Sequence, residues 1–336
     1  MKPAISIVLP VHNNAETIAE CIESILSQTF RCFEVLIIND GSTDSTVHII
    51  EQFAQIDTRI RLFHAGRIGL VNALNLGIGH ARADLIARMD GDDLMHPQRL
   101  EKQQRFMEQH PDIGLVASRA RLFPEQCIQR GYHEYMKWQN HCLSHEQISE
   151  QIYVESPFAH PSVMFRKHIL DRFGDYRHGD FPEDYELWLR LHHAGVKMAK
   201  LPDYLLKWRE YPQRTSRIDV RYQTDAFDQL RARYLAQDPN IPSDRPLVFW
   251  GAGRKTRQRA AHLISKGFAV TAWIDIDPKK IGNRINSIPV NSPGWLDRQP
   301  RPYVLNYVNN YGAREQIAIW LQQLGYKPKQ DYMMIG

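Results

Sequence analysis

Residues 85–96 read Leu-Ile-Ala-Arg-Met-Asp-Gly-Asp-Asp-Leu-Met-His, an apolar run that ends in three carboxylates within four positions. The run predicts a buried strand, and Asp90, Asp92 and Asp93 then emerge together at its carboxyl end, where α/β sheets bind their ligands. Three like charges this close repel one another, and a cation such as Mg2+ or Mn2+ relieves that repulsion. The alternative is a solvated acidic turn that caps a helix after Pro97, since Asp is common at helix starts.

The rest of the first 120 residues alternates strand and helix patterns, which is typical of a doubly wound α/β sheet. Asn13 or Asn14 is the expected cap of the first helix. The other expected strands are 5–10, 33–39, 60–64 and 114–118, and the expected helices are about 18–26, 44–53, 71–81 and 97–110. Residues 122–158 have no clear periodicity and are expected to be irregular. A strand at 162–165 and a helix at 184–194 are expected after them.

A polar, proline-bearing stretch at 237–245 predicts two domains, 1–240 and 241–336. Beyond it, an apolar run leads into Gly251-Ala-Gly253 and a small βαβ pattern. This is a dinucleotide fingerprint without its third glycine, and Asp275 lies about twenty residues on, where an acid would meet a ribose. We expect a small Rossmann-like α/β domain with a structural or regulatory role, because the segment has room only for the cofactor half of a dehydrogenase.

Composition narrows the class of protein. The chain carries 42 Lys and Arg against 38 Asp and Glu, and residues 243–336 carry 14 of those cations against 6 acids. That basic segment is either a solvated surface or a contact for anionic lipid or a phosphorylated partner, and no nucleic-acid-binding signature accompanies it. No stretch reaches the ~18 apolar residues of a membrane span. No signal peptide precedes the first strand and the four cysteines form no CxxC pair, so a reducing, cytoplasmic location is the simplest expectation.

Polar residues follow the first two predicted strands. After the first, residues 11–14 turn into a helix whose N-terminal amides either receive an anion or are simply capped, with Glu16 in the first turn. After the second, Ser42 or Asp44 caps the next helix, and Asp40 is left without a capping duty. A carboxylate at the end of a strand can accept hydrogen bonds from a base or a ribose.

Six ordered motifs in residues 4 to about 217 resemble those of family-2 glycosyltransferases, which have the GT-A nucleotide-sugar-binding sheet with flanking helices. They are Ser6-Ile-Val-Leu-Pro-Val-His-Asn13, Ile38-Asn-Asp-Gly-Ser-Thr-Asp44, Gly69-Leu-Val-Asn-Ala-Leu-Asn-Leu-Gly-Ile78, Ala87-Arg-Met-Asp-Gly-Asp-Asp93, His160-Pro-Ser-Val-Met-Phe-Arg166 and Glu183-Asp-Tyr-Glu-Leu-Trp-Leu-Arg190. The resemblance implies an inverting, metal-dependent enzyme that moves a sugar from a UDP- or GDP-linked donor to an acceptor hydroxyl. The acceptor would be a glycan or lipid-linked precursor of a cell-surface polysaccharide.

The resemblance also implies roles for residues on the nucleotide side. Asp90 and Asp92 match the family's DxD motif, with Asp90 toward the ribose and Asp92 toward a Mn2+ or Mg2+ that bridges the donor phosphates. Asp93 would orient them or touch the sugar. A divalent cation here neutralises the charge that develops on the departing diphosphate. The residues expected to line the nucleotide pocket are Pro10, His12, Glu16, Asp40 and Arg67.

On the acceptor side, Glu183 and Asp184 open a predicted helix, where acids also favour the helix dipole and so have a capping interpretation. The resemblance implies that Asp184 is the general base that takes the proton of the acceptor hydroxyl, with Glu183 orienting it or binding a sugar hydroxyl. His160 either caps a strand or contacts sugar, and Trp188 is the other expected acceptor contact.

Residues 208–216 read Trp-Arg-Glu-Tyr-Pro-Gln-Arg-Thr-Ser and resemble the family's closing loop, which usually reads Tyr-Arg-x-His. Arg209 fits that pattern, but Tyr211 stands where the histidine would be, which puts a third protein ligand to the metal in doubt. Arg209 and Arg214 would clamp the diphosphate as the loop closes.

Three other functions are alternatives. A nucleotidyltransferase would want a glycine-rich basic loop after the first strand, and residues 10–14 offer none. An NAD-dependent oxidoreductase would depend on the C-terminal fingerprint, and a non-catalytic nucleotide-sugar sensor would bind the donor without transfer. A lipid-linked acceptor is compatible with peripheral contact at the inner face of the membrane. The donor base, the sugar, the acceptor and the oligomeric state are not determined by the sequence.

Overall fold

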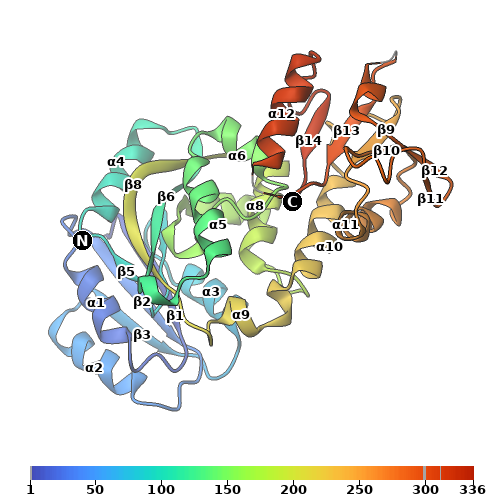
Figure 1. Cartoon of the computed structure of the whole chain (residues 1–336). Coiled ribbons are helices and arrows are strands. Elements are labelled where there is room, and N and C mark those ends of the chain that lie inside the picture. The colour runs from blue at the N-terminus through green and yellow to red at the C-terminus, as the bar shows by residue number, and fades with distance from the viewer. Residues whose placement is uncertain (1, 298–299, 311) are drawn as a thin grey trace. The chain divides into compact units, whose positions relative to one another are not determined.

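The computed structural model describes residues 2–297, 300–310 and 312–336, without the side chain of Cys127 (Figure 1). The contacts divide these residues into two compact units, which are described separately. The first unit comprises residues 1–148, 157–179 and 183–218, and the second comprises 149–156, 180–182 and 219–336. None of the helices in the described part of the chain has both the length and the apolar composition that a bilayer crossing needs.

The described residues of the first unit form a sheet of eight strands in the order β3-β2-β1-β4-β7-β6-β8-β5. The strands β1 to β4 are parallel to one another, and β7 runs antiparallel to both β4 and β6. The strands are β1 Ile5–Val11, β2 Phe33–Asn39, β3 Ile60–His64, β4 Leu85–Arg88, β5 Leu94–Met95, β6 Ile113–Phe123, β7 Met164–Arg166 and β8 Lys197–Arg209.

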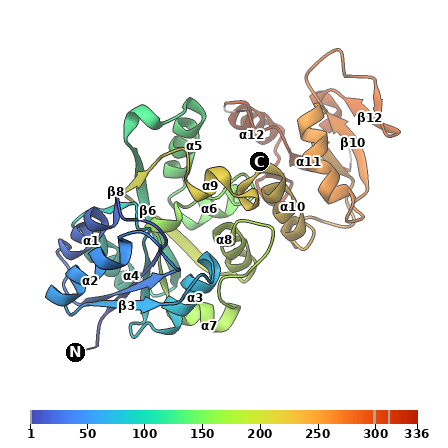
Figure 2. The ribbon, with the colours of Figure 1, turned by 90° about the horizontal axis from the view of Figure 1, so that it is seen from below.

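Helices cover both faces of the parallel part of this sheet (Figures 1 and 2). Alternate residues of β1 and β2 join the core under α1 (Ile18–Leu26) and α2 (Thr46–Ile56). On the opposite face, α3 (Leu70–Gly79) approaches closely, because a Cβ at Gly77 would lie 2.6 Å from Cγ1 of Val8. The carboxyl ends of β1, β2 and β4 therefore meet at one edge of a sheet that is held rigid from both sides.

The structure corrects one prediction about the helices between residues 99 and 218. Residues 122–158, expected to be irregular, contain two helices, α5 and α6, and β8 is a 13-residue strand that was not predicted. The buried face of α5 includes Gln139 and Asn140 beside Met136, so its apolar periodicity is broken in the sequence. The bounds are α4 Arg99–Gln109, α5 Arg130–His141, α6 His145–Gln151, α7 Lys167–Phe173, α8 Glu183–His193 and α9 Thr215–Ile218.

The loop after β1 also differs from expectation. α1 begins at Ile18, several residues beyond the expected cap, and the amide of Ile18 bonds to the carbonyl oxygen of Asn14. The side chain of Asn14 accepts a hydrogen bond from the amide of His12 at 3.0 Å instead. The side chain of Asn13 accepts one from the amide of Thr43 at 2.8 Å, which ties the loop after β1 to the loop after β2. The capping role expected of Asn13 or Asn14 is therefore wrong.

The described residues of the second unit form a six-stranded sheet in the order β11-β12-β10-β9-β13-β14, parallel except for β11. Strands are added on both sides of β9, as in doubly wound sheets, and the α/β character predicted for this region is confirmed. The elements are α10 Thr224–Leu235, β9 Leu247–Trp250, α11 Arg254–Ile264, β10 Val270–Ile274, β11 Arg284–Ile285, β12 Ile288–Asn291, β13 Tyr303–Asn306, α12 Ala313–Gln323 and β14 Tyr332–Met334.

The helix α10 belongs to the second unit by its contacts. Oδ2 of Asp228 on α10 lies 3.6 Å from Nε of Arg259 on α11, and Oδ1 of Asp225 lies 2.9 Å from Nε2 of His262. The polar stretch at 237–245 thus lies inside this unit, and the compact units divide at residue 219. The functional boundary at residue 240 stays a prediction.

Candidate active site

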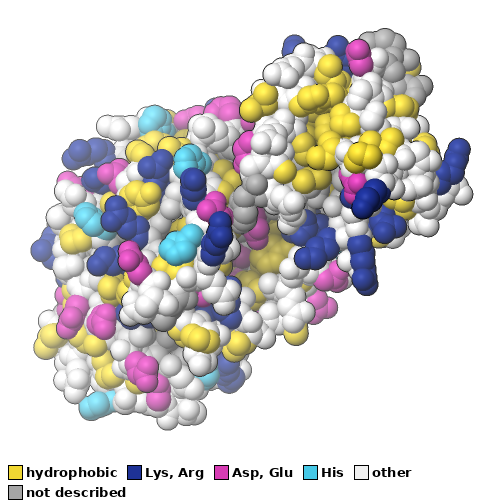
Figure 3. Space-filling view, viewed as in Figure 1, with side chains coloured by type: hydrophobic (Ala, Val, Ile, Leu, Met, Phe, Trp, Pro, Cys, Tyr) yellow, Lys and Arg dark blue, Asp and Glu magenta, His cyan; other side chains and the backbone are white. Residues whose placement is uncertain are grey.

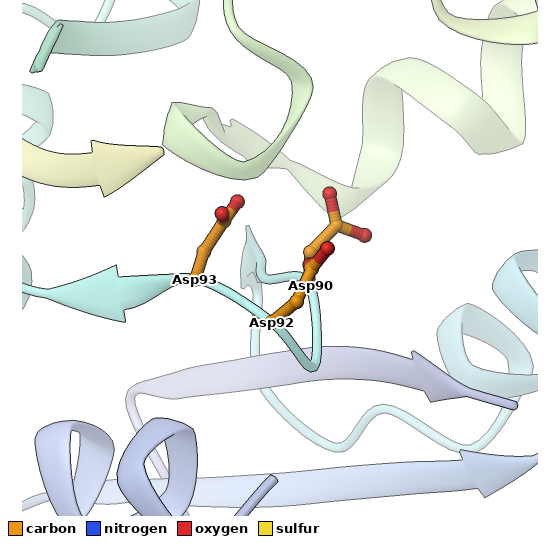
Figure 4. A group of neighbouring side chains, drawn as sticks. All are labelled: Asp90, Asp92 and Asp93. Atoms are coloured by element: carbon orange, nitrogen blue, oxygen red, sulfur yellow. The ribbon is translucent and has the colours of Figure 1, made fainter. Parts of the chain in front are cut away.

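The three carboxylates that follow β4 lie together (Figure 4). Asp90, Asp92 and Asp93 each offer an oxygen, and these oxygens all lie within 4.8 Å of one another. Asp93 is buried, and its Oδ1 accepts a hydrogen bond from the amide of Arg209 at 2.7 Å. Its Oδ2 is also buried and has no hydrogen-bond partner among the described residues. A carboxylate oxygen left in this state is available to a ligand.

The electrostatics of this cluster favour a cation. Burial, and then repulsion by Asp90, raises the pKa of Asp92. Burial raises the pKa of Asp93 still further, with Asp92 as the next cause. A divalent cation would remove both the desolvation cost and the repulsion, and an all-oxygen site suits Mn2+ or Mg2+. The solvated-turn alternative does not fit, because Asp93 is buried and the N-cap of α4 is Gln98.

Arg88, on β4, is a buried cation that sequence reasoning missed. Its side chain is 4% exposed, its Nη1 pairs with Oδ2 of Asp90, and its Nε has no hydrogen-bond partner among the described residues. Its positive charge also lowers the pKa values of Asp184 and His160, in both cases as a smaller cause than burial. An arginine inside an otherwise apolar strand, two positions before the acids, is the signal that would have found it.

The end of β8 closes over the acids. Arg209 donates from its Nε to the carbonyl oxygen of Asp92 at 2.6 Å, and its Nη2 lies 3.0 Å from Oε2 of Glu20. Tyr211, at the position of the family's histidine, donates its hydroxyl to Oδ2 of Asp92 at 2.8 Å. Tyr211, the residue that departs from the family pattern, therefore donates a hydrogen bond to Asp92, the expected metal ligand.

Arg214 lies in the loop after β8 and is also buried. Its guanidinium stacks on the ring of Trp208 at 4.1 Å and pairs with Glu210 at 3.2 Å. Glu210 holds Arg217 as well, at 2.6 Å. Glu210 thus already pairs with Arg214, which was expected to clamp the diphosphate. Arg214 could bind the diphosphate only if its ion pair with Glu210 broke.

Two adjacent acids begin α8. Glu183 is buried, whereas Asp184 is partly exposed and accepts a hydrogen bond from the amide of Tyr185 at 2.7 Å. Burial, and then repulsion by Glu183, raises the pKa of Asp184 to about 7. A carboxylate with a pKa in this range can take a proton near neutral pH more readily than an ordinary Asp.

The two expected acceptor contacts lie in the core. His160 is buried, with Nε2 2.8 Å from the hydroxyl of Tyr176 and Nδ1 3.8 Å from Oε1 of Glu183. Burial, and then the charge of Arg88, lowers the pKa of His160 well below its ordinary value, so the ring is neutral. Trp188 is fully buried and stands edge-on to His160 at 5.9 Å. In the structure His160 thus lies beside Glu183 and Trp188 packs against His160, and the acceptor contacts expected of both rings stay predictions. Tyr176 gave no signal in the sequence.

On the nucleotide side, Asp40 has the structural duty that the sequence did not reveal. Its Oδ1 accepts hydrogen bonds from the amides of Ile68 and Gly69 at 2.6 and 2.8 Å, and its Oδ2 pairs with Arg67 at 2.6 Å. It thus orders the turn before α3, a structural role other than capping, since no side chain caps α3 at Gly69. Nδ1 of His12 lies 2.9 Å from the carbonyl oxygen of Asp40.

The other two nucleotide-side candidates flank this group. Pro10 is buried in β1, and Glu16 is exposed in the turn before α1. The side chain of Arg67 is 62% exposed, so of the five candidates the residues that present polar atoms to solvent are mainly Glu16 and Arg67.

A family model described as glycosyl transferase family 2 matches residues 6–174, just over half of the 336-residue chain. The chain belongs to this family. Three relatives are similar over most of their own length. Amylovoran biosynthesis glycosyltransferase AmsE of Erwinia amylovora is 32% identical, covering 61% of this chain and 75% of its own. Putative glycosyltransferase EpsE of Bacillus subtilis is 32% identical (73% and 88%), and O-antigen biosynthesis glycosyltransferase WbnJ of Escherichia coli is 31% identical (68% and 87%).

Solved structures agree on the fold. Residues 1–349 of S. aureus TarS, crystallised with UDP-GlcNAc, superpose with a TM-score of 0.52 at 17% identity, covering 69% of this chain and 72% of that one. The predicted family, the GT-A fold and the enzyme class are thus confirmed for this family-2 glycosyltransferase. It is a nucleotide-sugar-dependent enzyme of a family in which inversion is typical and divalent metals are common.

Proposed function

We propose that this glycosyltransferase moves a sugar from a UDP- or GDP-linked donor to a hydroxyl of a glycan or lipid-linked acceptor in the synthesis of a cell-surface polysaccharide. The observation that carries the proposal is the cluster of three carboxylates after β4, whose oxygens all lie within 4.8 Å of one another. Arg88 pairs with Asp90 of this cluster, and Asp184, whose pKa burial and Glu183 raise to about 7, lies at the start of α8. The names of AmsE and WbnJ refer to amylovoran and O-antigen biosynthesis, which supports the polysaccharide assignment.

In this proposal Asp92 and Asp90 hold the metal ion, with Asp93 orienting them from its buried position. The unpartnered Oδ2 of Asp93 and the raised pKa values of Asp92 and Asp93 support a cation here. When bound, Mn2+ or Mg2+ neutralises the negative charge that develops on the leaving diphosphate. Arg209 fixes this loop through hydrogen bonds to the carbonyl oxygen of Asp92 and to Oδ1 of Asp93.

Asp184 acts as the general base. The acceptor oxygen forms a bond to the anomeric carbon as the bond from that carbon to the diphosphate breaks, and the hydroxyl proton passes to a carboxylate oxygen of Asp184. A single displacement needs one base and inverts the configuration. Glu183, held next to His160, keeps the pKa of Asp184 raised and orients it.

The nucleotide would lie against the ends of β1 and β2. Pro10 and His12 would shape the floor, the turn ordered by Asp40 would present Arg67, and the exposed Glu16 would be the other polar contact. The predicted domain 241–336, in which Asp275 accepts hydrogen bonds from the amides of Ala252 and Asp277, would have a structural or regulatory role. We also propose a reducing, cytoplasmic site of action with peripheral contact at the membrane, with which the free thiols of Cys21 and Cys32 are compatible.

A thermal-shift screen tests the proposal. The full chain is heated with UDP-, GDP- and CMP-sugars, each with Mn2+ and with EDTA. Stabilisation by a UDP- or GDP-sugar that requires Mn2+ is expected, since a ligand that binds only the folded state raises the melting temperature. Stabilisation by CMP-sugars alone, or by NAD(P) with turnover that depends on it, would contradict the assignment.

A further inference from the structure

A second polar hollow lies in the first unit, apart from the acidic cluster. It encloses about 430 Å³ between β6, β8 and α5. Side chains of Lys, Arg and His gather over α5 in the space-filling view (Figure 3). The charged and aromatic side chains that line it are Arg119, Arg121, Glu125, His133, Lys137, His141 and Tyr204. We call this set the basic hollow.

Local geometry brings these side chains together. Residues 119 and 121 of β6 point to one face of the sheet, and Arg119 is opposite Tyr204 of β8 in the strand register. On α5, His133 and Lys137 are four residues apart and so share one stripe of the helix. Asn140 pins that helix to the strand, since its side chain exchanges two hydrogen bonds with the backbone of Ala120, at 3.0 and 3.1 Å. The hollow is therefore a built feature of the fold.

The charge of the hollow is not neutralised from within. The guanidinium carbons of Arg121 and Arg119 lie 4.4 and 5.7 Å from the ring centre of Tyr204. Arg119 also donates from Nε to the carbonyl oxygen of Asn140 at 2.8 Å. Among the described residues, no carboxylate forms an ion pair with Arg119, Arg121 or Lys137, and Glu125 is the one acid in the described lining. Two arginines and a lysine around one concave space attract an anion.

We propose that the basic hollow binds a phosphate group carried by the acceptor. Guanidinium forks and a lysine ammonium are the side chains that proteins use for phosphate oxygens. The strand β6 also leads from the hollow to Phe123, on whose ring Arg209 stacks at 4.5 Å, and Arg209 contacts Asp92. The hollow thus lies along the same strand as the donor site. That the phosphate belongs to the acceptor rests on the proposed function, whereas the anion site itself does not.

Binding of inorganic phosphate to the full chain in EDTA, followed by ³¹P NMR line broadening, tests the site. The test variant carries Arg121→Gln and Lys137→Gln, both at exposed positions. The control carries Arg130→Gln and Lys207→Gln, which removes the same charge from exposed positions of α5 and β8 outside the hollow. We expect the test variant to weaken phosphate binding by on the order of tenfold or more, and the control by less than about twofold. Equal effects of the two variants, or no loss in the test variant, would overturn the proposal.

A third variant separates this site from the donor site. Asp92→Asn should weaken metal-dependent binding of UDP- or GDP-sugar by about 10–100-fold while phosphate binding in EDTA stays as in the wild type. Loss of phosphate binding in Asp92→Asn would place the anion at the donor site and overturn the proposal. If no nucleotide sugar binds the wild type at all, the proposed function fails while the phosphate result still decides the anion site.

The source of the phosphate is distinguished by sedimentation with vesicles of phosphatidylcholine and phosphatidylglycerol. Sedimentation that the test variant loses and the control retains assigns the hollow to a lipid-borne phosphate. Phosphate binding without sedimentation of the wild type assigns it to a phosphate on a soluble glycan. Stronger binding of acetate than of phosphate by the wild type contradicts the proposal, because a carboxylate would then be the preferred anion.

Discussion

Two strand ends in this molecule carry carboxylates and differ in how those carboxylates are satisfied. After β10 in the second unit, Asp275 accepts hydrogen bonds from the amides of Ala252 and Asp277 at 2.8 and 2.9 Å and pairs with Lys280 at 3.2 Å. After β4 in the first unit, burial and mutual repulsion raise the pKa values of Asp92 and Asp93, and Oδ2 of Asp93 has no partner in the described part of the chain. A strand-end carboxylate is thus available for a ligand only where the fold leaves its charge unsatisfied.

The largest expected effect concerns Asp184, the proposed general base at the start of α8. Asp184→Asn keeps the shape of the side chain but cannot accept a proton, so transfer should fall by roughly 10²–10⁴-fold with donor affinity nearly unchanged. Because the base must be deprotonated and the pKa of Asp184 is raised to about 7, wild-type transfer should fall as the pH drops through that value. The mutant should lose this acidic limb of the pH–rate profile. Asp171→Asn, an exposed position on α7, is the control, and wild-type-like transfer in Asp184→Asn would move the role to Glu183.

The next largest effect concerns Asp92, in the cluster whose negative charge is not neutralised. Asp92→Asn removes one charge from the proposed metal site and should weaken Mn2+-dependent donor binding by about 10–100-fold, measured by calorimetry with and without EDTA. The surface substitution Asp203→Asn, which breaks the pair with Lys102, removes the same charge and should leave that binding unchanged. If donor affinity is indifferent to both EDTA and Asp92→Asn, the metal assignment is wrong.

For Asp275, whose oxygens already accept hydrogen bonds, we predict that substitution changes stability and leaves donor binding unchanged. Asp275→Ala leaves the amides of Ala252 and Asp277 without their acceptor and should lower the free energy of unfolding by about 1–3 kcal/mol. Denaturant unfolding measures this, and donor binding measured on the folded variant should equal that of the wild type. A variant of unchanged stability that has lost NAD(P) binding would instead make Asp275 a ribose ligand.

The smallest expected effect concerns the tyrosine at the histidine position. Tyr211→Phe removes the hydrogen bond to Asp92, which the metal must otherwise displace, so Mn2+ should bind roughly two- to tenfold more tightly. Titration of Mn2+ in the presence of UDP measures this, with Tyr204→Phe as a control that removes a distant hydroxyl. Weaker Mn2+ binding in Tyr211→Phe would mean that the tyrosine oxygen supports the metal.

The sequence by itself determined the parallel strands, the family and the residues that could carry charge at the strand ends. These depend on local patterns, since a short apolar run followed by Asp90, Gly91, Asp92 and Asp93 has the same meaning wherever the strand lies in the sheet. The helices of residues 130–151 escaped this reasoning, because Gln139 and Asn140 are polar residues on a buried face and only their tertiary partners make that burial favourable.

Only the tertiary structure decided which polar side chains are free to act. Asp40 and Asp275 resemble ligand-binding acids in the sequence, but backbone amides from other segments already occupy their oxygens. Trp188 and His160 lie in family motifs, yet packing places both in the core. Availability depends on the hydrogen bonds and burial that distant segments impose, and no local pattern records those contacts.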